Sequence, residues 1–521
     1  MTRAPVLDGQ ETPRRRRSRL RRLVVRSARV VVLLVALLAA LLGWTYVSAE
    51  TDTAGKVAFE RPLAIPPLAP SRVDDQGRRV FDLGLQQGSA DLGQGQPTPT
   101  WGINGDYLGP TLRARRGEEV LVNVTNHVGE ETTLHWHGMH LPARMDGGPH
   151  QMIAPGETWS PTWQVDQPAA TLWYHPHLHG ATADHVLRGL AGMFLLDDAQ
   201  SRRLDLPHEY GVDDVPLVVQ DRSFDDDGEM EEGARFLNTT GFVGDTVVVN
   251  GTVGPYLDVQ TELVRLRVLN ASNARIYNFG FDDDRTFAMV ASDGGLLEAP
   301  HQTDRLLLSP GERAEIVVQM APGEQTVLRS YPADLGSNFL TTRLAGGDDT
   351  LDIVQLRAAE RLRQSPPLPG QLVDVPELDP AAAAATREFS LSGTQINGAN
   401  MDMERIGETV ALGTTEEWRV TNDDGQPHSF HVHDVQFQIL DIAGAEPSPS
   451  LAGWKDTVLL RPGETARLVM AFSDYADPDR PYMFHCHLLA NEDSGMMGQF
   501  VVVSPGDEAG SPPSAPHEHH G

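Results

Sequence analysis

The residues with the clearest chemical potential in this chain are four histidine pairs, each with one residue between the two imidazoles. The 521-residue sequence holds 19 histidines, and eight form these pairs: His135/His137, His175/His177, His431/His433 and His485/His487. Residues i and i+2 of a β-strand point to the same face, so each pair can direct two imidazoles into one cavity. Imidazole is a good ligand for copper, zinc, iron and nickel. Four pairs in one chain therefore predict a metal cluster.

The single cysteine, Cys486, lies inside the fourth pair. On a strand its side chain points away from the face of His485 and His487. One strand can then serve a thiolate site on one face and an imidazole site on the other, with a short covalent path for electrons between them. His428 upstream and Met496 downstream complete the His/Cys/Met set typical of a blue copper site.

Strands must position these residues, because the sequence repeats one β-rich pattern three times. Each copy has an Asn-Gly turn, an alternating run that ends in Asn and a Pro-Gly-Glu turn; the runs are 120–126, 264–270 and 417–422. Such repeats predict an all-β protein of three consecutive β-sandwiches, with strands at 120–124, 265–269, 315–319 and 466–472. All four histidine pairs lie in copies one and three. We therefore expect the cluster where the first and third units meet, with the middle unit as a spacer.

The amino-terminal segment differs from the rest of the chain. Residues 1–49 carry ten arginines against Asp8 and Glu11, whereas the whole chain has a net charge of −30. We expect residues 1–29 to form a basic cytoplasmic segment. Residues 30–49 are expected to form a hydrophobic helix that is either a transmembrane anchor or a signal peptide, exported by the general or the twin-arginine route. The acidic remainder argues against a nucleic-acid partner.

Together the motifs resemble those of multicopper oxidases, in particular the bacterial laccase-like and cuprous-oxidase enzymes. The resemblance rests on His135-Trp-His137-Gly, Trp173-Tyr-His175-Pro-His177, His428-Ser-Phe-His431-Val-His433 and His485-Cys486-His487 with Met496. It implies three cupredoxin-like Greek-key β-sandwich domains at 75–200, 210–360 and 386–504. A linker is expected at 361–385 and a disordered, His-containing tail at 505–521.

The resemblance also implies four copper ions, and it assigns their ligands by position. His135 and His431 would hold the type 2 ion, His428, Cys486 and Met496 the type 1 ion, and the type 3 pair would be held by His137, His175, His177, His433, His485 and His487. Asp146 and Glu492 match carboxylates that deliver protons to the cluster, and Asp424 matches one that binds substrate Cu(I).

One position departs from the family pattern. Asn491 stands where these enzymes carry a second type 1 histidine, and an amide oxygen is a harder and weaker copper ligand than imidazole. Three outcomes are open: an altered site completed by Asn491 or water, an empty or slow site, and a site completed by another side chain.

The function expected from these features is that of an extracytoplasmic, monomeric copper oxidase anchored to the cell membrane or exported after signal cleavage. A phenol, an aromatic amine or Cu(I) would donate electrons, and O2 would be reduced to water. The alternative is a non-enzymatic protein that binds or sequesters copper, which Asn491 favours. A two-domain-type nitrite reductase fits less well, because it uses fewer histidines.

Overall fold

The computed structural model describes residues 13–234 and 237–512, which form two compact units, 13–50 and 51–512. The expected tail therefore lies partly, and its histidines wholly, outside the described residues. The first unit is the helix α1 (Pro13–Ser48). Its part Arg21–Ser48 contains an 18-residue stretch with a mean hydropathy of 2.5 and is long and apolar enough to cross a membrane, as the sequence predicts. At 1.5 Å per residue its 28 residues reach about 42 Å, beyond the ~30 Å hydrocarbon core.

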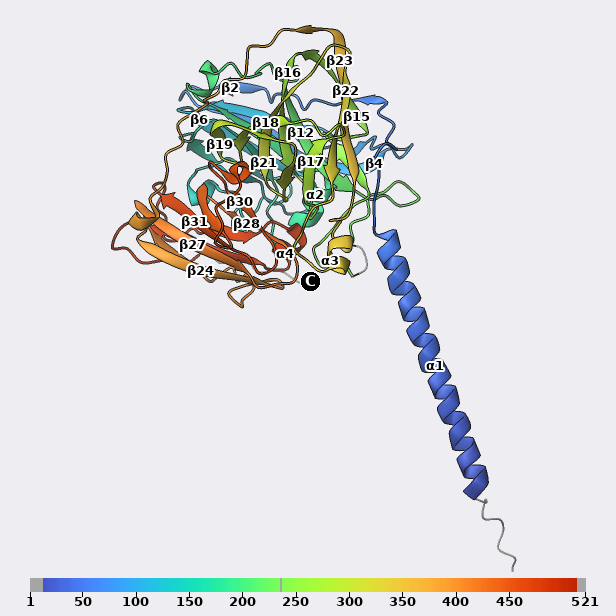
Figure 1. The fold of residues 1–521 in the computed structure, drawn as a ribbon. Coiled ribbons are helices and arrows are strands. Elements are labelled where there is room, and N and C mark those ends of the chain that lie inside the picture. The colour runs from blue at the N-terminus through green and yellow to red at the C-terminus, as the bar shows by residue number, and fades with distance from the viewer. Residues whose placement is uncertain (1–12, 235–236, 513–521) are drawn as a thin grey trace, which may run out of the picture. The chain divides into compact units, whose positions relative to one another are not determined.

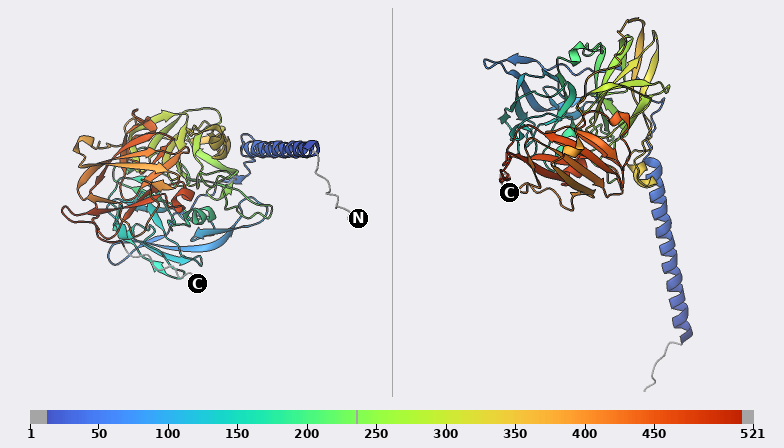
Figure 2. Two further views of the ribbon diagram at one scale, coloured as in Figure 1. Left: turned by 90° about the horizontal axis from the view of Figure 1, so that it is seen from below. Right: turned by 60° about the vertical axis from the view of Figure 1, so that its left-hand side comes forward.

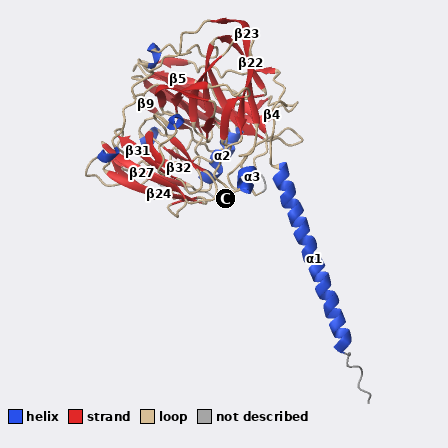
Figure 3. Ribbon diagram, viewed as in Figure 1, coloured by secondary structure: helices blue, strands red, loops and turns tan. Residues whose placement is uncertain are grey.

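Strands are the main regular structure of the second unit, and they form six sheets (Figures 1 and 3). The sheets pair into three sandwiches, coloured blue to teal, green to yellow and orange to red along the chain (Figure 2). This confirms the predicted fold class.

The first sandwich joins a six-stranded to a four-stranded sheet. Its strands are β2 (Ser71–Val73), β3 (Arg79–Ala90), β4 (Thr98–Ile103), β5 (Leu112–Arg115), β6 (Glu119–His127), β7 (His135–His137), β8 (Thr158–Trp159), β9 (Thr162–Gln164), β10 (Ala170–His175) and β11 (Gly192–Asp197). The helix α2 (Thr182–Arg188) and the 3-10 turns η1 (Ala143–Met145) and η2 (Ser201–Arg203) lie between or after these strands.

The middle sandwich joins a six-stranded to a seven-stranded sheet. Its strands are β1 (Arg61–Pro62), β12 (Asp214–Arg222), β13 (Thr246–Val249), β14 (Thr252–Val253), β15 (Pro255–Thr261), β16 (Leu263–Asn270), β17 (Tyr277–Phe281), β18 (Phe287–Ser292), β19 (Gly295–Thr303), β20 (Leu306–Leu308), β21 (Arg313–Gln319), β22 (Gln325–Tyr331) and β23 (Leu351–Arg363), with the helix α3 (Phe339–Leu344). The strand β1 pairs with β15, so the chain enters the middle sandwich before it builds the first.

The third sandwich has two five-stranded sheets. Residues 364–384, which include the 3-10 turn η3 (Pro380–Ala382), lead into it. Its strands are β24 (Ala385–Ser392), β25 (Gln395–Ile396), β26 (Glu408–Ala411), β27 (Thr414–Asn422), β28 (His428–Val432), β29 (Phe437–Ile442), β30 (Thr457–Leu460), β31 (Thr465–Phe472), β32 (Tyr482–Cys486) and β33 (Met497–Val503), with the 3-10 turn η4 (Pro449–Leu451) and the helix α4 (Leu489–Asp493).

The repeated sequence pattern has a structural cause. The asparagines of the Asn-Gly turns, Asn104, Asn250 and Asn397, all adopt a positive φ of 50–56°, which asparagine tolerates better than most residues. The side-chain oxygen of each accepts a backbone N–H from a strand of its own sandwich. Each Pro-Gly turn is held by a glycine N–H that donates to the carbonyl of the asparagine ending the alternating run.

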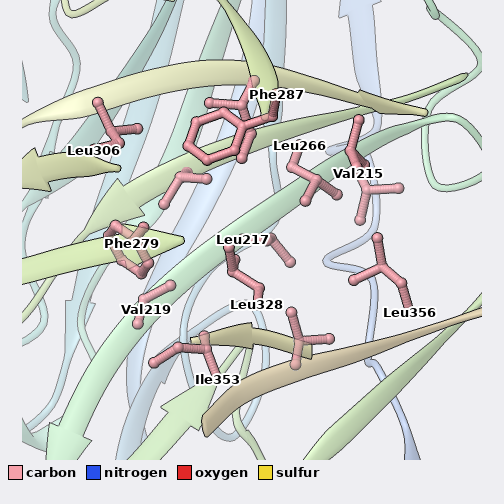
Figure 4. Packing of buried hydrophobic residues seen from close by; sticks show 14 of the residues in the cluster. Val215, Leu217, Val219, Leu266, Phe279, Phe287, Leu306, Leu328, Ile353 and Leu356 are labelled. Carbon is pink, nitrogen blue, oxygen red and sulfur yellow. The ribbon is translucent and has the colours of Figure 1, made fainter. Parts of the chain in front are cut away.

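Each sandwich buries its own apolar core between its two sheets. In the middle one, Val215, Leu217 and Val219 alternate along β12 and point toward Leu266 and Phe279 (Figure 4). This period of two is what a strand with one face on a core requires. These rigid sheets fix the strand ends that carry the histidines.

Candidate metal centre

Two pairs of adjacent strands carry the histidine motifs. In the first sandwich β7 runs antiparallel to β10, and His135 lies opposite His175. In the third sandwich β28 runs antiparallel to β32, and His431 lies opposite His485. Each sheet therefore presents neighbouring imidazoles on one face.

The eight paired histidines share one buried pocket between the first and third sandwiches. Each has at most 1% of its surface exposed. The rings of His135 and His433 stack with centroids 3.9 Å apart, and those of His137 and His431 stack at 3.7 Å. The two halves of the histidine set are thus interleaved, and neither sandwich alone could form the pocket.

Ring nitrogens in this pocket lack the hydrogen-bond partners that buried polar atoms normally have. Within the described part of the chain, no partner is found for these atoms: His135 Nε2, His137 Nδ1, His175 Nε2, His431 Nε2 and both ring nitrogens of His487. In addition, His485 Nε2 lies 3.1 Å from His177 Nε2 and 3.2 Å from His433 Nε2. One proton cannot satisfy three such nitrogens, but a metal ion can.

Backbone carbonyls set the proton position on several of these rings. Nδ1 of His135 donates to the Asp146 carbonyl at 2.9 Å, and Nδ1 of His175 donates to the Pro176 carbonyl at 2.8 Å. Because a neutral imidazole carries one proton, these bonds leave Nε2 bare for a metal. Burial also lowers the pKa of His177 to about 3, so that ring stays neutral and able to bind a metal near pH 7.

Buried carboxylates surround the imidazoles. Asp146 Oδ2 accepts a hydrogen bond from His433 Nδ1 at 2.8 Å. Glu492 lies with Oε2 3.1 Å from His485 Nδ1 and Oε1 3.4 Å from His177 Nδ1. Asp146 is 1% exposed and Glu492 is fully buried. Both carboxylates predicted from the resemblance therefore lie at the histidine set.

A second candidate site lies on the other face of β32. His428 Nδ1 is 3.4 Å from Cys486 Sγ, and the Asn491 amide nitrogen is 3.4 Å from His428 Nδ1 and 3.8 Å from Cys486 Sγ. The Met496 carbonyl accepts the Cys486 N–H at 3.0 Å. These four residues are at most 3% exposed, so the structure brings Asn491 to the position where a ligand to a metal at Cys486 would stand.

Asp424 connects this second site to the surface. Its Oδ2 lies 3.3 Å from His428 Nε2, and 23% of its side chain is exposed. The hydrogen bond with His428 lowers the pKa of Asp424 to about 2, so its carboxylate is charged at neutral pH.

Asn491 and Glu492 lie in the short helix α4 of the third sandwich, which is held against a short helix of the first. The next residue, Asp493, ends α4 and accepts the backbone N–H groups of Thr182 and Ala183 in α2, at 2.9 and 2.8 Å. This contact holds α4 of the third sandwich against α2 of the first. It therefore keeps Glu492 beside imidazoles from both sandwiches.

Sequence comparison shows to which protein family this chain belongs. Three domain families, each described as multicopper oxidase, match residues 85–201, 222–337 and 373–506. The chain belongs to the multicopper oxidase family. Members of this family bind copper, and the donors described above fit it: bare imidazole nitrogens in one pocket and a cysteine sulfur beside a histidine nitrogen.

Similar proteins within the multicopper oxidases carry two kinds of name. The cell division protein FtsP of Salmonella typhimurium is 37% identical over 450 residues, which cover 85% of this chain and 93% of that protein. The multicopper oxidase mco of Staphylococcus haemolyticus is 33% identical, with 85% and 92% covered. Among solved structures, the laccase-like multicopper oxidase CueO of Ochrobactrum sp. is 38% identical with a TM-score of 0.77, covering 85% of this chain and all of that one.

Sequence reasoning missed Asp456 and Arg313. Asp456 is fully buried with Oδ1 3.1 Å from His137 Nε2, and Arg313 of the middle sandwich pairs with it. Arg313 directly follows the Pro-Gly-Glu turn of the second copy, but no motif includes Asp456 or links the two residues, which lie 143 positions apart. The middle unit, predicted as a spacer, thus also reaches the histidine set of this multicopper oxidase.

Proposed function

We propose that this multicopper oxidase is an active extracytoplasmic oxidase that couples one-electron oxidation of a small reductant to four-electron reduction of O2 to water. The observation that carries the proposal is the set of eight buried imidazoles, with bare nitrogens in one pocket, directly behind the single cysteine on β32. A protein without redox chemistry has no need for both donor sets on opposite faces of one strand.

The ligand assignment follows the donors. His135 and His431 would hold a type 2 ion through Nε2. The other six paired histidines would hold a type 3 pair, one ion near His177, His433 and His485 and one near His137, His175 and His487. His428, Cys486 and Met496 would hold the type 1 ion, with Asn491 beside it. Copper, when bound, supplies one-electron redox chemistry and a binding place for O2.

Protons for water formation would come through the two buried carboxylates. Asp146 Oδ2 faces His433 Nδ1, while its Oδ1 has no hydrogen-bond partner among the described residues. Glu492 has both oxygens free of hydrogen bonds within the same described part. Such carboxylates can accept protons and pass them toward reduced oxygen.

The reductant would bind at Asp424. The residues assigned to the type 1 ion are buried, whereas the charged Asp424 carboxylate touches His428 and reaches solvent. A carboxylate favours a cation such as Cu(I) or a protonated aromatic amine over a neutral phenol. Gln426 next to it has no soft sulfur, so the site is not specialised for Cu(I) alone.

The apolar helix α1 would place the catalytic body outside the cytoplasm. Its arginines precede the apolar run, and positive charge stays on the cytoplasmic side. The body would then face the compartment from which O2 and reductants arrive, as a monomer either held by α1 or released from it.

A copper-binding protein without turnover is the second candidate, and Asn491 is the observation that favours it. Its amide stands in the position of a type 1 ligand, 3.8 Å from Cys486 Sγ. If the weaker ligand prevents reduction of that site, copper would be held but O2 would not be reduced.

Oxygen uptake by the copper-loaded protein distinguishes the two. We expect uptake with an aromatic amine or Cu(I), a thiolate-to-copper absorption band and four copper ions per chain. Cys486→Ser should lose the band and the uptake while it keeps the copper of the histidine pocket. Full copper loading with no uptake from any of the three donor classes would refute the oxidase and leave the copper-binding protein.

A further inference from the structure

Asp456 immediately precedes β30 and lies behind two stacked imidazoles from different sandwiches. Its side-chain Oδ1 is 3.1 Å from His137 Nε2, and its backbone carbonyl is 2.8 Å from His431 Nδ1. The two rings stack at 3.7 Å with an interplanar angle of 12°. One residue therefore contacts the outer nitrogen of both rings, through two different oxygen atoms.

These contacts require opposite proton positions on the two rings. Both oxygens are acceptors, so His137 must carry its proton on Nε2 and His431 must carry its proton on Nδ1. The nitrogens left bare are His137 Nδ1 and His431 Nε2, the same atoms that lack partners on the pocket side. If either ring held its proton on the other nitrogen, its donor atom for a metal would be blocked.

Arg313 of β21 holds the Asp456 side chain in place. Its two terminal nitrogens donate to the two carboxylate oxygens at 2.7 Å each. Arg313 Nε donates to the Thr171 carbonyl of the first sandwich at 2.9 Å. Arginine and aspartate are both fully buried, and a bidentate pair of this kind fixes the carboxylate plane. Arg313 thus connects all three sandwiches behind the histidine pocket.

We propose that the Arg313–Asp456 pair is a positioning device that sets opposite tautomers on His137 and His431, and that the middle sandwich thereby shapes a metal cluster to which it contributes no ligand. Copper as the metal rests on the proposed function. The tautomers are a property of the protein alone and are present before any metal binds.

Nuclear magnetic resonance of the copper-free full chain, with 15N-labelled histidine side chains, tests this directly. The wild type should show His137 protonated on Nε2 and His431 protonated on Nδ1. Asp456→Ala removes the carboxylate but keeps the backbone carbonyl. His137 should then populate both tautomers while His431 stays protonated on Nδ1, so His431 is an internal control that a general loss of structure would not spare.

Two further variants serve as controls, one for misfolding and one for a second hydrogen-bond acceptor near His137 Nε2. Asp456→Ala removes the bidentate partner of the buried Arg313 and leaves only the longer 3.8 Å contact with Asp293, so Arg313→Met with Asp456→Ala removes both charges of the pair and should give the same split between the rings. Thr457 Oγ1 lies 3.3 Å from His137 Nε2, and Thr457→Val should leave both tautomers unchanged. Copper affinity at the His137 position should fall about 10- to 100-fold in the aspartate variants.

The outcomes separate this inference from the proposed function. A wild-type His137 protonated on Nδ1, or a His137 tautomer unchanged by loss of Asp456, overturns the positioning role whatever the oxygen uptake. The expected tautomers in a protein that consumes no O2 would support the positioning role and refute the oxidase.

Discussion

Substitution of Gly138 by alanine tests the packing behind the histidine pocket. This glycine directly follows His137 and has a φ of +81°. A Cβ added there would lie 2.6 Å from Asp456 Oδ2, 2.8 Å from an Arg313 terminal nitrogen and 3.0 Å from Leu172 Cδ2. The left-handed backbone costs a residue with a Cβ roughly 1–2 kcal/mol. Overpacking of a filled core adds about 1–3 kcal/mol, so Gly138→Ala should cost about 2–5 kcal/mol in the free energy of unfolding.

Gly156→Ala is the matched control. Gly156 has a φ of +82° but no heavy atom within 4 Å of an added Cβ, so its substitution should cost only the backbone part, about 1–2 kcal/mol. Urea unfolding of the copper-free proteins measures both costs, and metal analysis after copper loading measures the effect on the cluster. The added methyl group must displace the Arg313–Asp456 pair. Equal costs for the two variants, or full copper occupancy in Gly138→Ala with an unchanged affinity, would show that no such displacement occurs.

Three other predictions concern the cysteine site and acid stability. Asn491→His should strengthen the thiolate-to-copper band and raise the rate of oxygen uptake by roughly tenfold or more. A tenfold rise corresponds to about 1.4 kcal/mol of activation free energy. An unchanged rate would mean that Asn491 does not limit turnover. Asp424→Asn should raise KM for a cationic donor by about fivefold, because one charge pair near 4 Å in water is worth about 1 kcal/mol. KM for a neutral phenol should rise by less than about twofold. Equal changes in the two KM values would count against Asp424 as the cation site. A hydrogen bond from Arg467 lowers the pKa of Glu417 to about 2, so its charge stabilises the fold above pH 4.5 and this stability is lost as the pH falls toward 2. Glu417→Gln should therefore flatten that part of the pH dependence of urea unfolding; an unchanged profile would contradict this.

The sequence predicted those parts of the structure that depend on local patterns. Alternating runs gave the strands, because a half-buried strand needs a side-chain period of two. The Asn-Gly and Pro-Gly turns repeat because their backbone conformations and hydrogen bonds recur in each sandwich. The histidine pairs predicted one pocket because i and i+2 share a strand face, and the structure places all eight imidazoles together.

Contacts between distant parts of the chain escaped prediction. Asp456 and Arg313 are one aspartate and one arginine among many, and nothing in their neighbours shows that they pair across two sandwiches. The strand β1, before the first sandwich, joins the sheet of the second through a parallel pairing with β15. Two residues form this strand, which is too short for any periodicity to reveal. In both cases tertiary packing, and not local pattern, selects the partner.

Anomalous diffraction at the copper absorption edge, from crystals of the copper-loaded protein, would locate each copper ion relative to the eight imidazoles and Cys486. We expect three peaks inside the histidine pocket, each next to ring nitrogens that are bare in this structure, and a fourth peak beside Cys486 Sγ. Peaks confined to surface carboxylates or to the His-containing tail, with none among the eight imidazoles, would contradict this expectation.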